Sequence, residues 1–306
     1  MRTLDMATFV ALARNRHFGQ TAREMNATQP AISSRLAALE EEFGCRLVER
    51  GDGSFRLTPH GEKALHVFQS VLRSLGGLRA ALQSPQADAP DVVRIGAIDS
   101  VASTFMPHLI ESLHDSMPTL KIELTVEGTK LLVQGMNKGN YDVIFAVDPA
   151  VGDGFGSFVS CTLQMIWAGS PKLIDPARIY SVDDLAQMPI ITFPKDTPPY
   201  RQIAPYFQDE RVLASKLTSS NSLFAIINLL IDGFGVGAIP TVTIQRELKQ
   251  DLLQPIRVSK RFPPMPIIAT YRSGADPDLI PLVVRQARAS AAYYCTTVDP
   301  TLAWID

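Results

Sequence analysis

A chain of 306 residues is too long for one ordinary domain and predicts two or three. Hydrophobic residues make up 46% and charged residues 20%, a balance typical of globular proteins with apolar cores. No apolar run approaches the roughly 18 residues of a membrane helix, and the first residues lack a signal-peptide pattern, so we expect a cytoplasmic protein without membrane contact.

Charge and cysteine content give few indications of a partner or cofactor. The net charge is −2, and residues 1–60 hold eight Arg and no Lys against seven Asp and Glu, so DNA binding must be argued from the placement of side chains. The three cysteines, Cys45, Cys161 and Cys295, lie far apart and form no CxxC motif. We therefore expect free thiols, no metal site and no cofactor; a redox switch would require the fold to bring two thiols together.

Three helices are predicted in the first 44 residues. They cover Leu4–Ala13, Phe18–Met25 and a segment that Thr28 caps and Gly44 ends. Apolar residues of the third helix form one stripe, and the face opposite is small and polar at its start. A helix that presents such a first turn fits the major groove, although an ordinary solvated helix has the same pattern. The candidate base and phosphate contacts are Thr28, Gln29, Pro30, Ser33, Ser34 and Arg35.

A β-hairpin is predicted directly after the third helix. Residues 46–50 and 54–57 are strand-like, and the glycine-rich segment 51–53 between them is typical of a hairpin turn. A hairpin in this place is a wing, from which Arg50 and Arg56 could reach phosphates or the minor groove. Residues 1–58 are therefore predicted to be a winged helix-turn-helix domain that binds DNA.

A long helix follows, with a possible role in dimerisation. Thr58 and Pro59 are typical of a helix start, and a polar, proline-containing linker ends the segment 59–90. Its apolar residues follow a heptad pattern, which favours pairing with a second subunit over packing on its own domain. These residues are Leu65, Phe68, Leu72, Leu75 and Leu82.

Residues 91–306 alternate strand and helix patterns, which predicts mostly parallel sheets covered by helices. We expect two lobes, with lobe I at about 91–160 and 267–306 and lobe II at about 161–266. Ligands bind such sheets beyond the carboxyl ends of the strands, where this chain places hydroxyl clusters and two cations that suit a carboxylate. Each cluster could also be simple helix capping. The candidate ligand contacts are Ser100, Ser103, Thr104, Thr129, Thr192, Pro194, Lys195, Arg201 and Asn221.

The chain resembles the LysR-type transcriptional regulators over nearly its whole length. The motifs of the first 61 residues are Phe9-Val-Ala-Leu-Ala, Thr28-Gln-Pro-Ala-Ile-Ser33 and Leu57-Thr-Pro-His-Gly61; those of the later part are Gly139-Xaa-Tyr141-Asp142 and Gly233-Phe-Gly-Val-Gly-Ala-Ile-Pro240. The resemblance implies an α/β two-lobed effector domain of the periplasmic-binding-protein type. It also implies strands that cross between the lobes near Ala146–Val147 and near Pro263–Pro266, and a homo-oligomer, commonly a tetramer.

The sequence thus predicts a multidomain α+β protein that binds promoter DNA and is controlled by a small, anionic metabolite held between two lobes. RNA polymerase is the expected further partner. An enzyme is the competing interpretation, but the sequence has no nucleophile elbow, P-loop, zinc-protease motif or dinucleotide-binding turn. A solute-binding protein is disfavoured by the additional N-terminal segment and the missing signal peptide.

Overall fold

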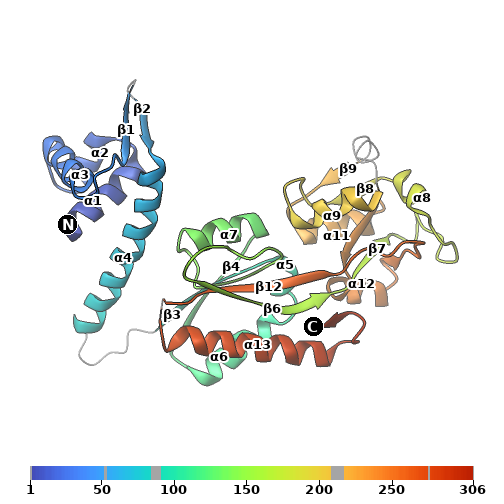
Figure 1. Cartoon of the computed structure of the whole chain (residues 1–306). Helices are drawn as coiled ribbons and strands as arrows, with labels where there is room; N and C mark the ends of the chain where they lie inside the picture. Colours follow the sequence, from blue (N-terminus) through green and yellow to red (C-terminus); the bar gives the residue numbers. More distant parts are fainter. Residues whose placement is uncertain (1, 52–53, 84–90, 208–216, 275, 306) are drawn as a thin grey trace. The chain divides into compact units, whose positions relative to one another are not determined.

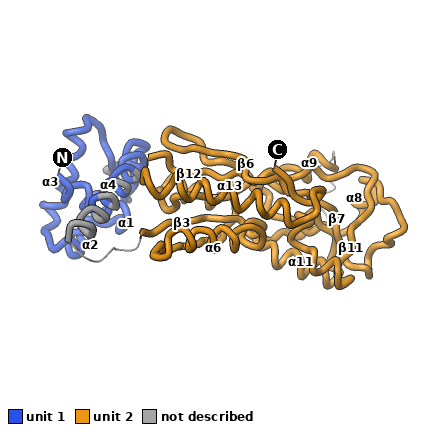
Figure 2. The backbone as a smooth tube through the Cα atoms, turned by 90° about the horizontal axis from the view of Figure 1, so that it is seen from below, with its two compact units in different colours: residues 1–89 blue, residues 90–306 orange. Residues whose placement is uncertain are grey.

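The computed structural model describes residues 2–51, 54–83, 91–207, 217–274 and 276–305. They form two compact units, Met1–Ala89 and Pro90–Asp306, which Figure 2 colours separately. Each unit has its own hydrophobic core and is described by itself. None of the helices in these ranges combines the length and the hydrophobicity that a bilayer crossing requires.

Unit 1 consists of three short helices, a hairpin and a long helix (Figure 1). In chain order they are α1 (Thr3–Asn15), α2 (Phe18–Glu24), α3 (Gln29–Phe43), β1 (Val48–Gly51), β2 (Ser54–Leu57) and α4 (Pro59–Gln83). The Thr28 hydroxyl accepts a hydrogen bond from the Ala31 N–H, and Gly44 ends α3 with a φ of 63°. The predicted winged helix-turn-helix is confirmed. Its core is a single apolar cluster that includes Phe9, Leu12, Ile32, Leu36 and Leu39.

The first half of α4 belongs to the core of unit 1. Phe68 is 3% exposed and lies 5.7 Å from the Phe9 ring and 5.9 Å from the Phe43 ring, measured between ring centroids. Leu65 and Leu72 pack against the same cluster. Three residues of the predicted dimer seam are thus used within their own domain, whereas the side chain of Leu82 lies outside the described residues.

Gly61 allows α4 to lie directly on the base of the wing. The Thr58 N–H donates to the Leu47 carbonyl at 3.1 Å, and the Thr58 hydroxyl donates to the Arg46 carbonyl at 2.7 Å. A Cβ atom on Gly61 would overlap the carbonyl oxygen of Leu47, which is backbone and cannot rotate away. Glycine is therefore required at this close approach for steric reasons.

Lobe I of unit 2 contains a six-stranded sheet in the order β13-β6-β12-β5-β3-β4. Its strands are β3 (Val92–Ala97), β4 (Lys121–Val126), β5 (Val143–Ala146), β6 (Phe155–Leu163), β12 (Met265–Arg272) and β13 (Ala303–Trp304). Its helices are α5 (Asp99–Ala102), α6 (Met106–Ser116), α7 (Thr129–Asn137) and α13 (Leu279–Thr297). Strand β5 is buried on both faces: Val143 and Phe145 join the cluster that contains residues of α6 and α13, and Ile144 and Ala146 join the cluster around α7.

Lobe II contains a five-stranded sheet in the order β11-β7-β10-β8-β9. Its strands are β7 (Met165–Gly169), β8 (Ile190–Thr192), β9 (Leu217–Ser219), β10 (Val236–Pro240) and β11 (Gln254–Pro255). Its helices are α8 (Val182–Ala186), α9 (Pro198–Phe207), α11 (Leu223–Ile231), the 3₁₀ helix η1 (Thr241–Ile244) and α12 (Gln245–Lys249).

Both sheets are mixed, so the expectation of mostly parallel sheets is wrong. β3 is parallel to β4 and β5, and β8 is parallel to β9 and β10. In contrast, β12 is antiparallel to β5 and β6, and β7 is antiparallel to β10 and β11. The reason is the connection between the lobes: β6 leads directly into β7, and the returning chain enters the lobe I sheet as β12.

The first crossing between the lobes also differs from the expectation. Ala146 ends β5 inside the lobe I sheet, and the chain crosses into lobe II at Gln164, between β6 and β7. It returns at Pro264, immediately before β12, within the second range that was expected. The Gln164 N–H donates to the Leu302 carbonyl at 2.9 Å, and the Gln164 carbonyl accepts from the Thr241 N–H, also at 2.9 Å.

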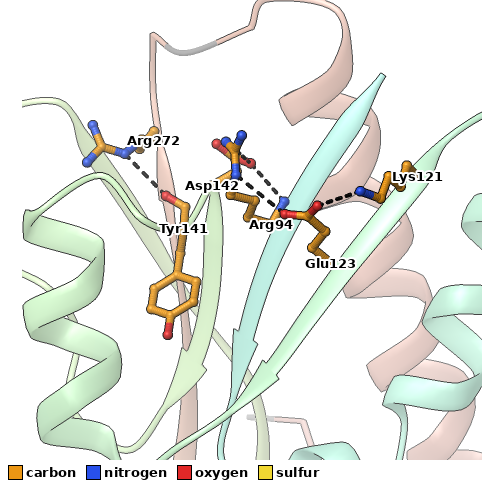
Figure 3. A network of polar contacts seen from close by, with 6 residues as sticks. All are labelled: Arg94, Lys121, Glu123, Tyr141, Asp142 and Arg272. Carbon is orange, nitrogen blue, oxygen red and sulfur yellow. Dashed lines mark hydrogen bonds and ion pairs between the residues drawn. The ribbon is translucent and has the colours of Figure 1, made fainter. Parts of the chain in front are cut away.

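A polar network fixes the starts of the parallel strands in lobe I (Figure 3). The Asp142 carboxylate accepts the Arg94 N–H at 2.8 Å, and Arg272 donates to the carbonyls of Tyr141 and Met136 at 3.3 and 2.6 Å. The motif that contains Tyr141 and Asp142 is therefore explained by strand alignment. Its network lies at the amino ends of these strands, away from the edge where ligands bind such sheets.

We expect Gly61→Ala to destabilise unit 1, because the new methyl group must displace α4 from β1. Overpacking of this kind reduces the free energy of unfolding by about 1–3 kcal/mol, equivalent to a fall of several degrees in the melting temperature of a small domain. Calorimetry of the full chain measures this change. Gly274→Ala is the matched control, because nothing lies within 4 Å of its added Cβ. Equal melting profiles for both variants would contradict the close contact.

Candidate functional sites

The start of α3 presents a small, exposed surface. Gln29, Pro30 and Ser34 are exposed and Ser33 is half-buried, whereas the Thr28 hydroxyl is engaged as the helix cap. Ile32, Leu36 and Leu39 hold the opposite face of α3 in the core. The first turn of α3 is thus an exposed polar surface that the core supports from beneath.

Arg35 and the wing arginines are placed differently from one another. The Arg35 guanidinium donates to the Thr8 hydroxyl of α1 at 3.1 Å, so the expectation that it points outward is wrong. Arg35 instead joins α3 to α1. Arg56 is exposed on β2, opposite Glu49 in the strand register. The backbone of Arg50 belongs to β1, but its side chain lies outside the described residues.

Glu40 connects α3 to the wing and was not anticipated from the sequence. It is 8% exposed, and one carboxylate oxygen accepts the N–H groups of Leu47 and Val48 at 2.9 and 3.2 Å. The other oxygen faces Arg46 at 3.4 Å. A buried carboxylate with such partners sets the direction of β1 relative to α3. The sequence showed Glu40 only as one acid in a run of three.

A cavity of about 70 Å³ lies between the two lobes of unit 2. Three of the nine predicted ligand residues line it: Ser100, Thr129 and Asn221. The Thr129 hydroxyl accepts the Val147 N–H at 3.3 Å, and within the described residues no hydrogen bond involves the Ser100 hydroxyl. The remaining lining is mainly apolar and includes Val147, Met165, Phe193, Leu223 and Met265.

The other predicted ligand residues are not part of this lining. Ser103 and Thr104 donate to the carbonyls four residues earlier, at 2.9 Å to Asp99 O and 2.7 Å to Ser100 O, so both hydroxyls bond the backbone at the end of α5 rather than cap the start of a helix. Arg201 forms an ion pair with Asp148 at 2.5 Å. Lys195 is exposed and Pro194 half-buried, and Thr192 is buried with no partner for its hydroxyl among the described residues.

Within the part of the chain that the structure describes, three polar contacts join the lobes around the cavity. The Asp99 carboxylate accepts the Leu223 N–H at the start of α11, at 3.4 Å. Lys130 contacts Asp196 at 3.1 Å, and Arg201 contacts Asp148 as described. The two ion pairs are exposed, so each stabilises closure by at most about 1 kcal/mol. These ion pairs therefore add little to the association of the two lobes.

The charged groups of the lining are acidic. Asp99 and Glu127 line the cavity, and none of the described residues that line it is Lys, Arg or His. Asp99 already occupies the N-terminus of α11, and Pro198 and Pro199 at the start of α9 offer no N–H groups. Among the described residues, no group of three or more His, Cys, Asp or Glu side chains is arranged to hold a metal ion.

Comparison with known proteins identifies the family. The family model described as "LysR substrate binding domain" matches residues 87–292. A second family model, "Bacterial regulatory helix-turn-helix protein, lysR family", matches residues 4–62. The chain belongs to the LysR family. Its members are DNA-binding transcriptional regulators rather than enzymes, which confirms that part of the prediction.

Individual relatives are distant. The chain is 28% identical over 249 residues to the "HTH-type transcriptional regulator TtuA" of Agrobacterium vitis, covering 79% of this chain and 81% of that protein. It is 33% identical over 145 residues to the "Probable hydrogen peroxide-inducible genes activator" of Streptomyces viridosporus, covering 47% of this chain and 46% of that one. The crystal structure of ArgP from Mycobacterium tuberculosis has a TM-score of 0.74 at 16% identity, covers 94% of this chain and 96% of that chain, and supports the fold alone.

We expect Glu40→Ala to weaken both unit 1 and its DNA binding, because two buried N–H groups lose their acceptor. Each unpaired group reduces the free energy of unfolding by about 1–3 kcal/mol. Chemical denaturation and DNA titration measure the two effects. Glu41→Ala, at an exposed neighbouring position, is the control and should change neither quantity. Unaltered stability in Glu40→Ala would show that β1 does not depend on this carboxylate.

Proposed function

We propose that this LysR-family regulator responds to a small molecule bound in the cavity between the lobes. The observation that supports this is a cavity of about 70 Å³ that is lined by residues of both lobes and bordered by polar contacts between them. A ligand that binds the closed form better shifts the lobes toward closure by its difference in affinity, about 1.4 kcal/mol for each tenfold preference. In an oligomer, this movement changes the spacing of the winged domains on DNA.

The proposed partners follow from this mechanism. The winged domains bind promoter DNA, and a homo-oligomer, dimer or tetramer, supplies two or more copies for adjacent half-sites. Ligand-dependent bending of the promoter then changes the access of RNA polymerase. Because the chromosome is the target, we propose a cytoplasmic location.

We propose the charge of the effector from the residues that line the cavity. This charge is positive, whereas the sequence favoured a negatively charged effector. That expectation depended on Lys195 and Arg201, neither of which lines the cavity. A helix N-terminus carries about half a positive charge, whereas Asp99 and Glu127 each provide a full negative charge. The negative charge of the lining therefore exceeds the positive charge of a helix N-terminus. Together with the apolar side chains of the lining, it favours a ligand with an apolar body and an amino group. Ser100 and Thr129 would hydrogen-bond its polar substituents.

Thermal-shift measurements on the full chain test this proposal with a primary amine and a carboxylate built on the same carbon skeleton. A ligand at 100 times its Kd stabilises the folded state by about 2.7 kcal/mol, and we expect the amine member of a pair to give this shift. Glu127→Gln should weaken amine binding by up to about tenfold, through the lost charge attraction. Glu111→Gln on α6, outside the lining, is the control. Preferential binding of the carboxylate would contradict the proposed charge.

The DNA contacts are tested by two substitutions with different expected signatures. Gln29→Ala should cost roughly 1–3 kcal/mol at the cognate site and relax the preference for one base, because a base-edge hydrogen bond is lost. Arg56→Ala should weaken binding to all sequences alike and reduce the salt dependence, because it removes a phosphate contact. Competition titrations at several salt concentrations separate these effects. If Gln29→Ala weakened binding to all sequences alike and Arg56→Ala relaxed the base preference, the roles assigned to the two residues would be wrong.

A further inference from the structure

A second hollow of unit 2 lies at the two chain crossings and shares no lining residue with the cavity between the lobes. The crossing residues Gln164 and Pro264 both line it, and its volume is about 720 Å³, within the usual range of small-molecule sites. We call it the hinge groove. Its charged and aromatic residues, which come from both lobes, are Arg201, Tyr206, Lys260, Arg261, Phe262 and Trp304.

The charge of the hinge groove is positive. Arg201 belongs to α9, Lys260 and Arg261 precede β12, and none of the described residues that line the groove is Asp or Glu. The whole chain has a net charge of −2, so three cations without an acid are a local concentration of positive charge. The cavity between the lobes has the opposite composition, because its charged residues are Asp99 and Glu127. The hinge groove therefore favours a negatively charged ligand.

Two of these cations are placed to bind such a ligand. The Lys260 ammonium donates to the Tyr206 carbonyl at 3.3 Å, and the Tyr206 hydroxyl donates to the Lys260 carbonyl at 2.6 Å, so α9 holds Lys260 in position. Arg261 is exposed, and within the described residues no hydrogen bond or ion pair involves its guanidinium. A guanidinium in this state can bind a phosphate through two parallel N–H groups.

Aromatic rings form another part of the hinge groove. Tyr206 and Phe262 are each 3% exposed, and their ring centroids lie 5.4 Å apart. Trp304 is half-buried on β13, where it is paired with Thr162 of β6, so part of its side chain stays accessible. An indole provides a large flat surface on which another ring can stack. The groove thus combines the features that bind a planar ring with those that bind an anion.

We propose that the hinge groove binds a nucleotide, whose base stacks on Trp304 and whose phosphate groups bind Arg261 and Lys260. Three cations in one groove exceed the single negative charge of a simple aromatic acid, and the volume exceeds that of one small ring. A nucleoside diphosphate carries several negative charges together with a planar base and a sugar between them. Binding at this groove does not depend on the function proposed above.

Arg201 connects the hinge groove to the contacts between the lobes. It lines the groove and also forms the ion pair with Asp148. A phosphate group in the groove competes with the Asp148 carboxylate for this guanidinium, so a bound nucleotide should weaken the association of the lobes. By reciprocity, a ligand that favours closure should weaken nucleotide binding by the same factor. The ion pair is exposed, so this factor is at most about fivefold. This consequence rests on the proposed function.

The alternative is a solvated groove whose cations are ordinary surface residues. Most Lys and Arg side chains of proteins are exposed and need no ligand. A solvated groove predicts that any polyanion binds weakly through general charge attraction, whether or not it carries a ring. The nucleotide proposal predicts that the ring and the phosphate groups are both required.

Isothermal titration calorimetry of the full-length protein tests the proposal with ADP, GDP, CDP and UDP. We expect at least one of them to bind, and its parent nucleoside and inorganic pyrophosphate to bind at least about tenfold more weakly. Arg261→Gln should weaken nucleotide binding by about tenfold, because charge-assisted hydrogen bonds are lost. Arg257→Gln, at an exposed position outside the lining, is the matched control and should leave the affinity unchanged.

Three outcomes of this titration would overturn the nucleotide site. The first is that none of the four nucleotides binds. The second is that pyrophosphate or the parent nucleoside binds as tightly as the nucleotide, because one half of the ligand would then suffice. The third is an equal loss of affinity in Arg261→Gln and Arg257→Gln, which would indicate general charge attraction.

Tryptophan fluorescence tests the position of the base. The chain has two tryptophans, Trp304 in the groove and Trp167, which is 1% exposed. The nucleotide should quench the fluorescence of the wild type but not of Trp304→Phe, in which the phenyl ring retains most of the affinity. Trp304→Ala should lose at least about fivefold in affinity, because the stacking is lost. Circular dichroism monitors the folding of each variant. Quenching that persists in Trp304→Phe would contradict the assigned position.

Titration of both ligands together tests the coupling separately. The nucleotide should weaken the binding of a cavity amine by up to about fivefold, and Asp148→Asn should remove this effect, because Arg201 then has no carboxylate to exchange. An unchanged amine affinity would overturn the coupling and leave the nucleotide site in place. An amine that binds when no nucleotide does would overturn the nucleotide site alone, whereas the reverse result would overturn the proposed effector instead.

Discussion

The organisation of unit 2 depends on two short chain crossings, at Gln164 and Pro264, because its two lobes share no β-sheet. The apolar cluster of the domain continues through these crossings, around Leu163, Met165 and Met265. Away from the crossings, the described parts of the two lobes are joined by two exposed ion pairs and by one hydrogen bond at the start of α11. Covalent continuity therefore fixes where the lobes meet, and weak contacts determine how closely they approach. A small ligand can shift such a balance with ordinary binding energy.

In unit 1, by contrast, close contacts hold the wing, α3 and α4 in fixed positions relative to one another. Glu40 binds two N–H groups of the wing, and Gly61 lets α4 rest on the carbonyl of Leu47. Arg35, which the sequence assigned to DNA, joins α3 to α1. The side chains left to meet a base are few and small, and they project from a rigid support. Specificity then depends on how the oligomer positions several such domains on one DNA duplex.

The sequence predicted well what depends on local chemistry. Thr28, Gly44 and Pro59 act as helix boundary signals within a few residues, and the spacing of Ile32, Leu36 and Leu39 fixes the buried face of α3. Long-range decisions carry no such signal. Whether a hydroxyl bonds the nearby backbone, as in Ser103, or lines a cavity, as in Ser100, depends on which strand ends the fold brings together. For the same reason, the first lobe crossing, the mixed sheets and the apolar lining of the cavity could not be predicted.

Cys161 and Cys295 show the same limit of the sequence. They lie far apart in the chain, yet β6 and α13 place both in the apolar cluster of lobe I. Cys161 lies on the strand that leads to the first crossing, and the bulge at Ser160 bends that strand. Packing in the core of lobe I therefore sets the direction in which the chain enters the crossing at Gln164 and reaches Met165, at the wall of the cavity.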